Sequence, residues 1–160
     1  MPVSTIRFAQ GTVPPTPPAP AALRLAGPVV PVQIEVPSLL AKHLASVQKP
    51  VPPPVTGLAL VDTGATSTAV NESTASGLGV SPVGTATVGT AGGSHLQPVF
   101  PLKITLPQSQ MSIEYEQVMG ADLSGCQVMG QQLLLLIGRD VLERMILIYD
   151  GPGGQFTLAF

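Results

Sequence analysis

The residues of this chain most able to do chemistry form the tripeptide Asp62-Thr63-Gly64. It directly follows an apolar run at residues 57–61, which predicts a buried strand that ends at a carboxylate. Gly64 lets backbone N–H groups approach that carboxylate, and the Thr63 hydroxyl is able to tie the turn to a symmetry-related copy. Ala65 follows and offers the carboxylate no side-chain hydroxyl. Taken alone, the tripeptide also fits an ordinary turn at a strand end.

Hydrolysis by a carboxylate needs a partner acid. Two carboxyl groups about 3 Å apart share one proton, because ionising both is costly. The ionised group takes a proton from an attacking water, while the protonated group donates a hydrogen bond to the carbonyl oxygen of the substrate. The Asp-Thr-Gly arrangement occurs once in the chain. The sequence therefore predicts that a second Asp62 comes from a second subunit, and that the reaction needs no metal or cofactor.

A second motif near the C-terminal end joins an apolar run at residues 133–137 to Gly138-Arg139-Asp140. The run is too short to span a bilayer, which takes about 20 residues, and it favours a strand buried on both faces. Gly138 permits a close approach of backbone behind the first motif. Asp140 is well placed to accept hydrogen bonds from the first turn of a short helix over residues 141–145.

With both motifs present in this order, the chain resembles the retropepsins, the single-domain aspartic proteases of retroviruses and their soluble bacterial relatives. The resemblance covers residues 29–160. It implies an all-β, barrel-like acid protease fold with one short C-terminal helix, active as a homodimer. It also implies that Asp62 is the catalytic residue of an aspartic endopeptidase that cleaves peptide or protein substrates, and that Thr63, Gly64 and Ala65 shape the active-site turn.

The resemblance further implies structural roles for two other parts of the chain. Arg139 is expected to make ion pairs that brace the active-site turn and the subunit contact, with Gly138 and Asp140 as further support; an ordinary surface arginine is the alternative. Because the chain termini of retropepsins interleave between subunits, residues 156–160 are expected at or near the dimer contact.

Between the two motifs, residues 82–106 predict a hairpin with a glycine-rich tip. Such a hairpin is able to act as a flap that excludes water and holds the main chain of the substrate. A plain hairpin loop is the alternative, because the tip lacks a large aromatic side chain. His95 beside the tip is either a substrate contact, a pH sensor or an exposed loop histidine. The candidate flap and substrate-binding residues are Thr90, Ala91, Gly92 and Gly93.

Length and composition agree with one domain. A chain of 160 residues suits a single core, whereas an enzyme with both aspartates in one chain needs about twice that length. The formal charge of -2 argues against nucleic-acid binding, and no membrane association is expected. With 44% apolar and 10% charged residues, the composition favours a subunit interface. Cys126 is the sole cysteine and is expected to be a small buried residue. Because it has no partner for an intrachain disulfide, a reducing, cytoplasmic setting is expected.

The N-terminal segment is rich in proline. The cluster predicts a flexible, proline-rich arm at residues 1–27, ahead of a protease domain at residues 28–160. It falls where the apolar core of a secretory signal would lie, so no such signal is expected. The arm is interpreted as a linker, with docking to a partner and self-cleavage as alternatives. The cluster comprises Pro14, Pro15, Pro17, Pro18 and Pro20.

Hydrophobic periodicity predicts the remaining elements. Pro31 predicts that the first of these strands is an edge or terminal strand, and Asp122 is expected in a loop because a leucine interrupts its resemblance to the first motif. The predicted strands lie at residues 30–36, 66–70, 111–119, 146–150 and 156–160, and short helices or turns at 37–48 and 71–78.

The sequence leaves two alternatives to a homodimeric protease. One is a catalytically inactive binding or scaffold module that keeps the retropepsin fold. The other is a half-enzyme that pairs with a different chain. Both alternatives place the same tripeptide at the same strand end, so the sequence does not separate them.

Overall fold

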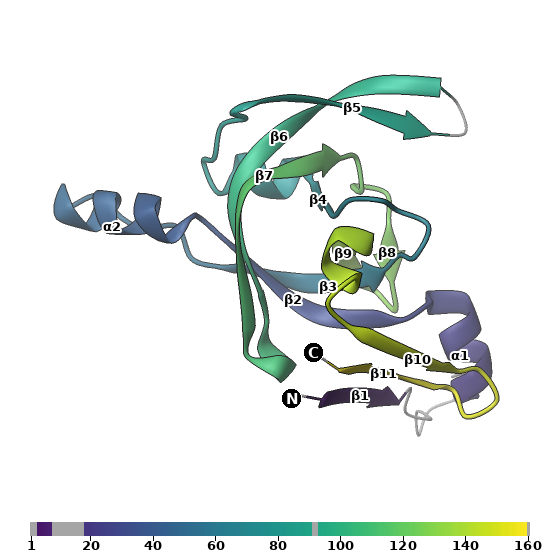
Figure 1. The fold of residues 1–160 in the computed structure, drawn as a ribbon. Coiled ribbons are helices and arrows are strands. Elements are labelled where there is room, and N and C mark those ends of the chain that lie inside the picture. Colours follow the sequence, from purple (N-terminus) through teal and green to yellow (C-terminus); the bar gives the residue numbers. More distant parts are fainter. Residues whose placement is uncertain (1–2, 8–17, 91–92, 160) are drawn as a thin grey trace.

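The computed structural model describes residues 3–7, 18–90 and 93–159, and its centre is a closed β-barrel (Figure 1). Each strand of the barrel pairs with a neighbour on both sides, and the pairing of β2 with β6 closes the ring. In order around the barrel, the strands are β2 (Val29–Glu35), β3 (Val55–Val61), β9 (Gln131–Ile137), β4 (Ala69–Asn71), β7 (Met111–Ala121) and β6 (Gly93–Leu106).

Strands β3 and β9 form a parallel pair, and each of the two sequence motifs follows the end of one of these strands. Both are apolar over most of their length, as expected for strands covered on both faces. Their register pairs Val61 with Ile137, so the residues that follow, Asp62 and Gly138, emerge at the same end of the barrel. The buried strand predicted at residues 133–137 is confirmed.

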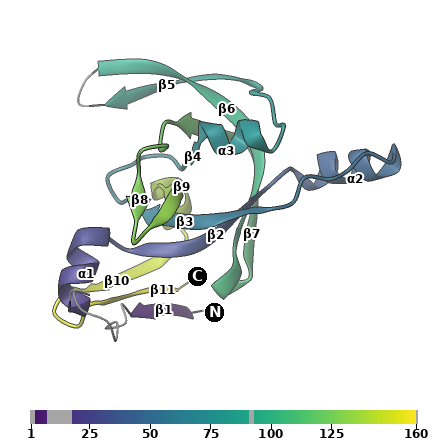
Figure 2. The same cartoon turned by 180° about the vertical axis from the view of Figure 1, so that it is seen from behind.

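A hairpin of β5 (Gly84–Thr90) and the first half of β6 extends beyond the barrel. Figures 1 and 2 show this hairpin as a separate layer that faces β4 and β7. The hairpin predicted within residues 82–106 is therefore confirmed, and residues 91–92 of its predicted tip lie outside the described residues.

A smaller three-stranded sheet lies against the other end of the barrel, where both ends of the described chain meet (Figure 1). Its central strand is β11 (Gln155–Ala159), which pairs with β10 (Ile146–Asp150) on one side and β1 (Val3–Arg7) on the other. Phe156 and Leu158 are buried because alternate residues of β11 face the core. The predicted closing hairpin is confirmed, whereas β1 was not foreseen.

The helices are short and lie outside the barrel. None within the described residues is long and apolar enough to cross a membrane. Helices expected near residues 37–48 and 71–78 are confirmed, and the single short helix of the predicted fold is joined by three others. They are α1 (Ala19–Ala26), α2 (Ser38–Ser46), α3 (Glu72–Gly77) and α4 (Arg139–Leu142), with a 3-10 turn at Pro107–Ser109 and a short strand, β8 (Gln127–Val128), beside β9.

The flexible arm predicted for residues 1–27 does not hold for β1 and α1. β1 pairs along its length with β11, and α1 packs against the core through Leu23, which is 0% exposed. Proline is tolerated in the first turn of a helix, where its missing N–H is not needed, and α1 uses one there. The flexible, extended arm predicted from the proline content is therefore wrong for this segment. Residues 8–17, which include Pro14, Pro15 and Pro17 of the cluster, lie outside the described residues.

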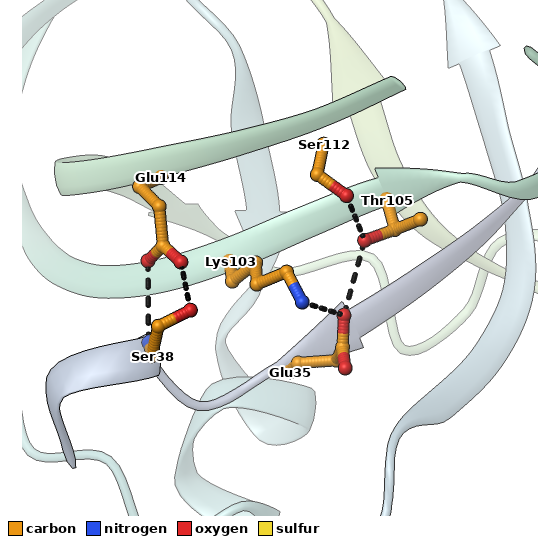
Figure 3. A network of polar contacts seen from close by, with 6 residues as sticks. All are labelled: Glu35, Ser38, Lys103, Thr105, Ser112 and Glu114. Carbon is orange, nitrogen blue, oxygen red and sulfur yellow. Dashed lines mark hydrogen bonds and ion pairs between the residues drawn. The ribbon is translucent and has the colours of Figure 1, made fainter. Parts of the chain in front are cut away.

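A polar network holds the seam where β2 meets β6 (Figure 3). The ammonium group of Lys103 lies 3.2 Å from a carboxylate oxygen of Glu35, and the Thr105 hydroxyl donates to the same oxygen at 3.0 Å. Thr105 also shares a hydrogen bond of 2.8 Å with Ser112 on β7. Pro31 lies in the half of β2 that pairs with β3 alone, so the missing N–H leaves no gap at this seam.

Helix α2 projects away from the barrel in both views (Figures 1 and 2). The same network anchors its first residue, because the hydroxyl and the N–H of Ser38 both donate to the Glu114 carboxylate (Figure 3). None of its residues is fully buried, and Leu39 is 81% exposed. The insertion between β2 and β3 thus leaves the barrel intact.

Two leucines of α1 test whether this helix is part of the packed fold. Leu23→Ala is expected to lower the free energy of unfolding by about 2–5 kcal/mol, because it empties a fully buried site. Leu25→Ala, in the same helix at 75% exposure, is expected to change it by less than about 0.5 kcal/mol. Urea denaturation followed by circular dichroism measures both. Equal, small effects would show that α1 is a loose arm after all.

Candidate active site

Asp62 is the first residue after β3 and remains tied to the strand pair. Its N–H donates to the carbonyl oxygen of Ile137 at 2.9 Å, which continues the β3–β9 pairing by one residue. Its Oδ1 accepts hydrogen bonds from the N–H groups of Gly64 at 2.9 Å and Ala65 at 3.3 Å. A Cβ on Gly64 would lie 3.1 Å from that oxygen, so glycine leaves the carboxylate room. The turn therefore holds the half-buried carboxylate in one orientation.

Gly138 allows the second motif to touch the loop that follows Asp62. A Cβ at this position would lie 2.3 Å from the carbonyl carbon of Ser67 and 2.7 Å from the backbone nitrogen of Thr68. The close approach predicted behind Asp62 is thus made to residues further along the loop. Because these neighbours are backbone atoms, any larger side chain would push the loop away from the barrel.

Arg139 spans the active-site loop. Its backbone N–H donates to the Ala65 carbonyl oxygen at 3.0 Å, and its guanidinium donates to the Thr63 carbonyl oxygen at 3.3 Å and to the Thr66 hydroxyl at 2.9 Å. Within the described residues these partners are neutral, and no carboxylate lies within ion-pair distance of Arg139. The ion pairs expected from the resemblance are therefore not found within the described part of this chain.

Asp140 fastens the far end of the loop through Thr68. One carboxylate oxygen accepts hydrogen bonds from the Thr68 N–H at 2.9 Å and the Thr68 hydroxyl at 2.8 Å. The same hydroxyl accepts a hydrogen bond from the Gly138 N–H at 3.1 Å. The expected bond to the first helical turn is also present, from the Val141 N–H at 3.0 Å, but α4 begins at Arg139 instead of residue 141.

Tyr115 on β7 adds a titratable group to this cluster. Burial raises the pKa of its phenol above the ordinary value, and the negative charge of Asp140 acts in the same direction. The hydrogen bond with Thr68 and the positive charge of Arg144 lower the pKa, but burial is the larger effect. The phenol therefore stays neutral and links β7 to the residues that hold the loop.

Asp62 opens onto a cleft of about 640 Å³ between the loop and the β5–β6 hairpin. Its carboxylate is the one charged group among the described residues of the lining, and apart from the amide of Gln97 the other side chains are small, hydroxylated or apolar. Helix α2 contributes nothing to this surface. The cleft is lined by Asp62, Gly64, Ala65, Thr66, Ser67, Ala69, Thr87, Val88, Gly89, Gln97, Met119, Gly120, Ala121 and Leu136.

The predicted flap residues are only partly placed. Thr90 and Gly93 end the two hairpin strands, and Ala91 and Gly92 lie outside the described residues. Val88 and Gln97 line the cleft but were not predicted, because the prediction relied on the glycine content of the tip. The period-two pattern of the two strands is the sequence signal that identifies them.

Two further sequence predictions concern residues outside the cleft. Asp122 lies in a loop, as predicted, and accepts hydrogen bonds from the hydroxyl and N–H of Ser124, which lower the pKa of this exposed carboxyl. Cys126 is exposed, so the expectation of a buried residue is wrong; the turn after Asp122 carries it to the surface. No metal-binding cluster of histidine, cysteine or acidic residues occurs in the described ranges.

The barrel, the single aspartate at the end of a parallel strand pair and the cleft above it define an acid-protease type of site. Residues 54–141, more than half of the chain, match the family described as Aspartyl protease, and the chain belongs to this family. The match spans both motifs. It confirms the resemblance to retropepsin-like aspartic proteases and, with the barrel, the all-β fold class.

Similar solved structures come from a virus and a bacterium. The solution structure of Simian Foamy Virus (mac) protease is 18% identical, with a TM-score of 0.41, over 71% of this chain and 91% of that chain. A crystal structure of a retropepsin-like aspartic protease from Rickettsia conorii is 13% identical, with a TM-score of 0.42, over 98% of this chain and 90% of that chain. No curated protein sequence matches the chain.

The contact at Gly138 is open to a direct test. Gly138→Ala is expected to lower the free energy of unfolding by about 2–4 kcal/mol, because the new methyl group meets the Ser67–Thr68 backbone. Gly125→Ala is the matched control, since nothing lies within 4 Å of a Cβ there. Denaturant titration of both variants gives the comparison. Gly138→Ala as stable as the control would refute the close packing of the two motifs.

Tyr115 gives a prediction at alkaline pH. Because its pKa is raised in the folded protein, the unfolded chain releases this proton first, so stability that is complete below about pH 10 decreases above it. In an absorbance titration at 295 nm, one of the 2 tyrosines is expected to ionise late. Tyr115→Phe is expected to remove the late step and Tyr149→Phe to retain it. The reverse outcome would show that Tyr115 is not the buried phenol.

Proposed function

We propose that this chain is an aspartic endopeptidase that works as a homodimer, with Asp62 of each subunit forming the catalytic pair. The observation that carries the proposal is the isolation of Asp62: it is held by the turn and by β9, and no second carboxylate lines its cleft among the described residues. A lone carboxylate lacks the partner acid that this chemistry requires. A twofold-related copy supplies an identical one.

In the proposed reaction the two carboxyl groups share one proton. The ionised group accepts a proton from water as the water attacks the carbonyl carbon of the peptide, and the protonated group donates a hydrogen bond to the carbonyl oxygen. The proton then passes to the leaving amine, which completes hydrolysis. Thr63, Gly64 and Ala65 shape the turn, and Gly138, Arg139 and Asp140 support it.

The substrate is proposed to bind as an extended peptide between the loop and the β5–β6 hairpin. The cleft between them is lined largely by small side chains, which leaves room for a main chain and alternate side chains. The hairpin, including residues Thr90 to Gly93 at its tip, is the proposed flap that separates the reacting groups from water.

Subunit contact is proposed at two places. The Thr63 hydroxyl is exposed and has no hydrogen-bond partner within the described part of the chain, so it is available to a second subunit. Residues 156–160 stay a predicted contact; β11 already pairs on both edges with β1 and β10, so a partner there would meet the sheet at its face or its outer edges.

Digestion of a mixed peptide library tests the activity. Asp62→Asn is expected to lower the rate by about 10³-fold or more, because the pair loses its ability to share a proton. Asp122→Asn is the control, since this exposed loop carboxylate lies outside the cleft. A pepstatin-type inhibitor is expected to block the wild type. Library cleavage that survives Asp62→Asn would overturn the assignment of the catalytic residue.

Subunit mixing tests the shared site and separates the alternatives. When wild type re-equilibrates with an equal amount of Asp62→Asn, random pairing is expected to leave about half of the original activity. Unchanged activity would show that each chain works alone. A stable dimer that cleaves nothing favours the binding module, and a monomer that gains activity only with another chain favours the half-enzyme. Analytical ultracentrifugation supplies the mass in each case.

A further inference from the structure

The β5–β6 hairpin presents two different faces. In its register Val88 pairs with His95, and Thr87 pairs with Leu96. Residues directly opposite each other in an antiparallel pair point to the same face, and neighbours along a strand point to opposite faces. Val88 and His95 therefore share one face, together with Gln97, and Thr87 and Leu96 share the other.

The face that carries His95 is the one turned toward Asp62. Val88 and Gln97 on that face are half-buried and line the cleft. Thr87 on the opposite face also borders the cleft but is exposed, and its partner Leu96 is 71% exposed, so the alternation of burial identifies the inner face. His95 lies opposite Val88 and two residues before Gln97, so it continues the cleft surface toward the tip of the hairpin. Its own side chain is exposed, which leaves it accessible to a peptide bound beneath the hairpin.

Among the residues that the structure describes, no side chain pairs with His95. It makes no side-chain hydrogen bond or ion pair within the described residues, and residues 73–102 contain no other acidic, basic, cysteine or tyrosine side chain. Elsewhere on the cleft the sole charge is the Asp62 carboxylate. A histidine donates a hydrogen bond in either protonation state and carries a positive charge in acid. It is therefore complementary to a carboxylate that the substrate brings.

We propose that His95 is a specificity-determining residue that selects an acidic side chain in the bound peptide. The inference rests on the proposed peptidase function and names the substrate class that this site takes. An extended peptide alternates its side chains, so one position faces the inner face of the hairpin. That position lies away from the cleaved bond, because a substrate carboxylate next to the Asp62 pair would be repelled.

Paired peptides that differ only by Glu or Gln test the proposal. The replacement is placed at each position around a cleaved bond in turn, and kcat/KM is measured at pH 5, where histidines are mostly protonated. At one position Glu is expected to be favoured about fivefold over Gln, as for a charge-assisted hydrogen bond at a partly exposed site. His95→Gln is expected to abolish this preference, and His95→Lys, which keeps a cation, to retain it.

Leu96→Gln is the matched control, since it places the same amide on the outer face of the same strand. This variant is expected to keep the wild-type Glu-to-Gln ratio. If no position favours Glu, or if His95→Gln leaves the ratio unchanged, the inference is wrong. Because His95 is exposed, none of these replacements empties a buried site.

A binding measurement separates this inference from the proposed function. The same peptide pairs, labelled with a fluorophore, are titrated with the Asp62→Asn variant and followed by anisotropy. Tighter binding of the Glu peptide that disappears in Asp62→Asn with His95→Gln supports the inference even where the wild type cleaves nothing. Equal binding of the Glu and Gln peptides overturns it even where cleavage and its loss in Asp62→Asn are observed.

Discussion

The structure depends on the parallel pairing of β3 and β9 and on the contact that follows it. Because Val61 and Ile137 are in register, the segments that follow β3 and β9 leave the barrel at the same end. The Gly138 backbone then contacts the loop after Asp62 at Ser67 and Thr68. Several hydrogen bonds hold this loop, because Arg139 and Asp140 bind it through backbone and side chain at both ends. The position of Asp62 is therefore set by packing between motifs far apart in sequence.

The closed barrel provides the rigid frame for that contact. The β2–β6 pairing and the Lys103–Glu35 ion pair close the barrel, and β6 continues past the barrel to form the hairpin above the cleft. One strand thus connects the barrel to the element proposed to cover substrate. The insertion that forms α2 lies outside this connection, which explains why it alters neither the barrel nor the cleft.

Charge is distributed sparingly around the site. A single carboxylate faces a cleft of small and uncharged side chains, and the nearby guanidinium of Arg139 is directed to neutral oxygens of the loop instead of to Asp62. A lone acid in such a cleft needs a second one to share its proton. Because the cleft carries so few charges, a further ionisable group beside it, as proposed for His95, would strongly affect which substrates the site accepts.

Sequence patterns alone determined the two apolar strands, the carboxylate that ends the first, the hairpin between them and the closing hairpin, because period-two burial and turn residues are local properties. They did not reveal β1, the packing of α1 or the Thr68–Asp140 bonds. Each of these joins residues many positions apart, and proline content pointed to an extended arm where a helix forms. The identity of Asp62 was thus local information. Its orientation, its cleft and the face on which His95 lies were decided by strand register, which only the tertiary structure specifies.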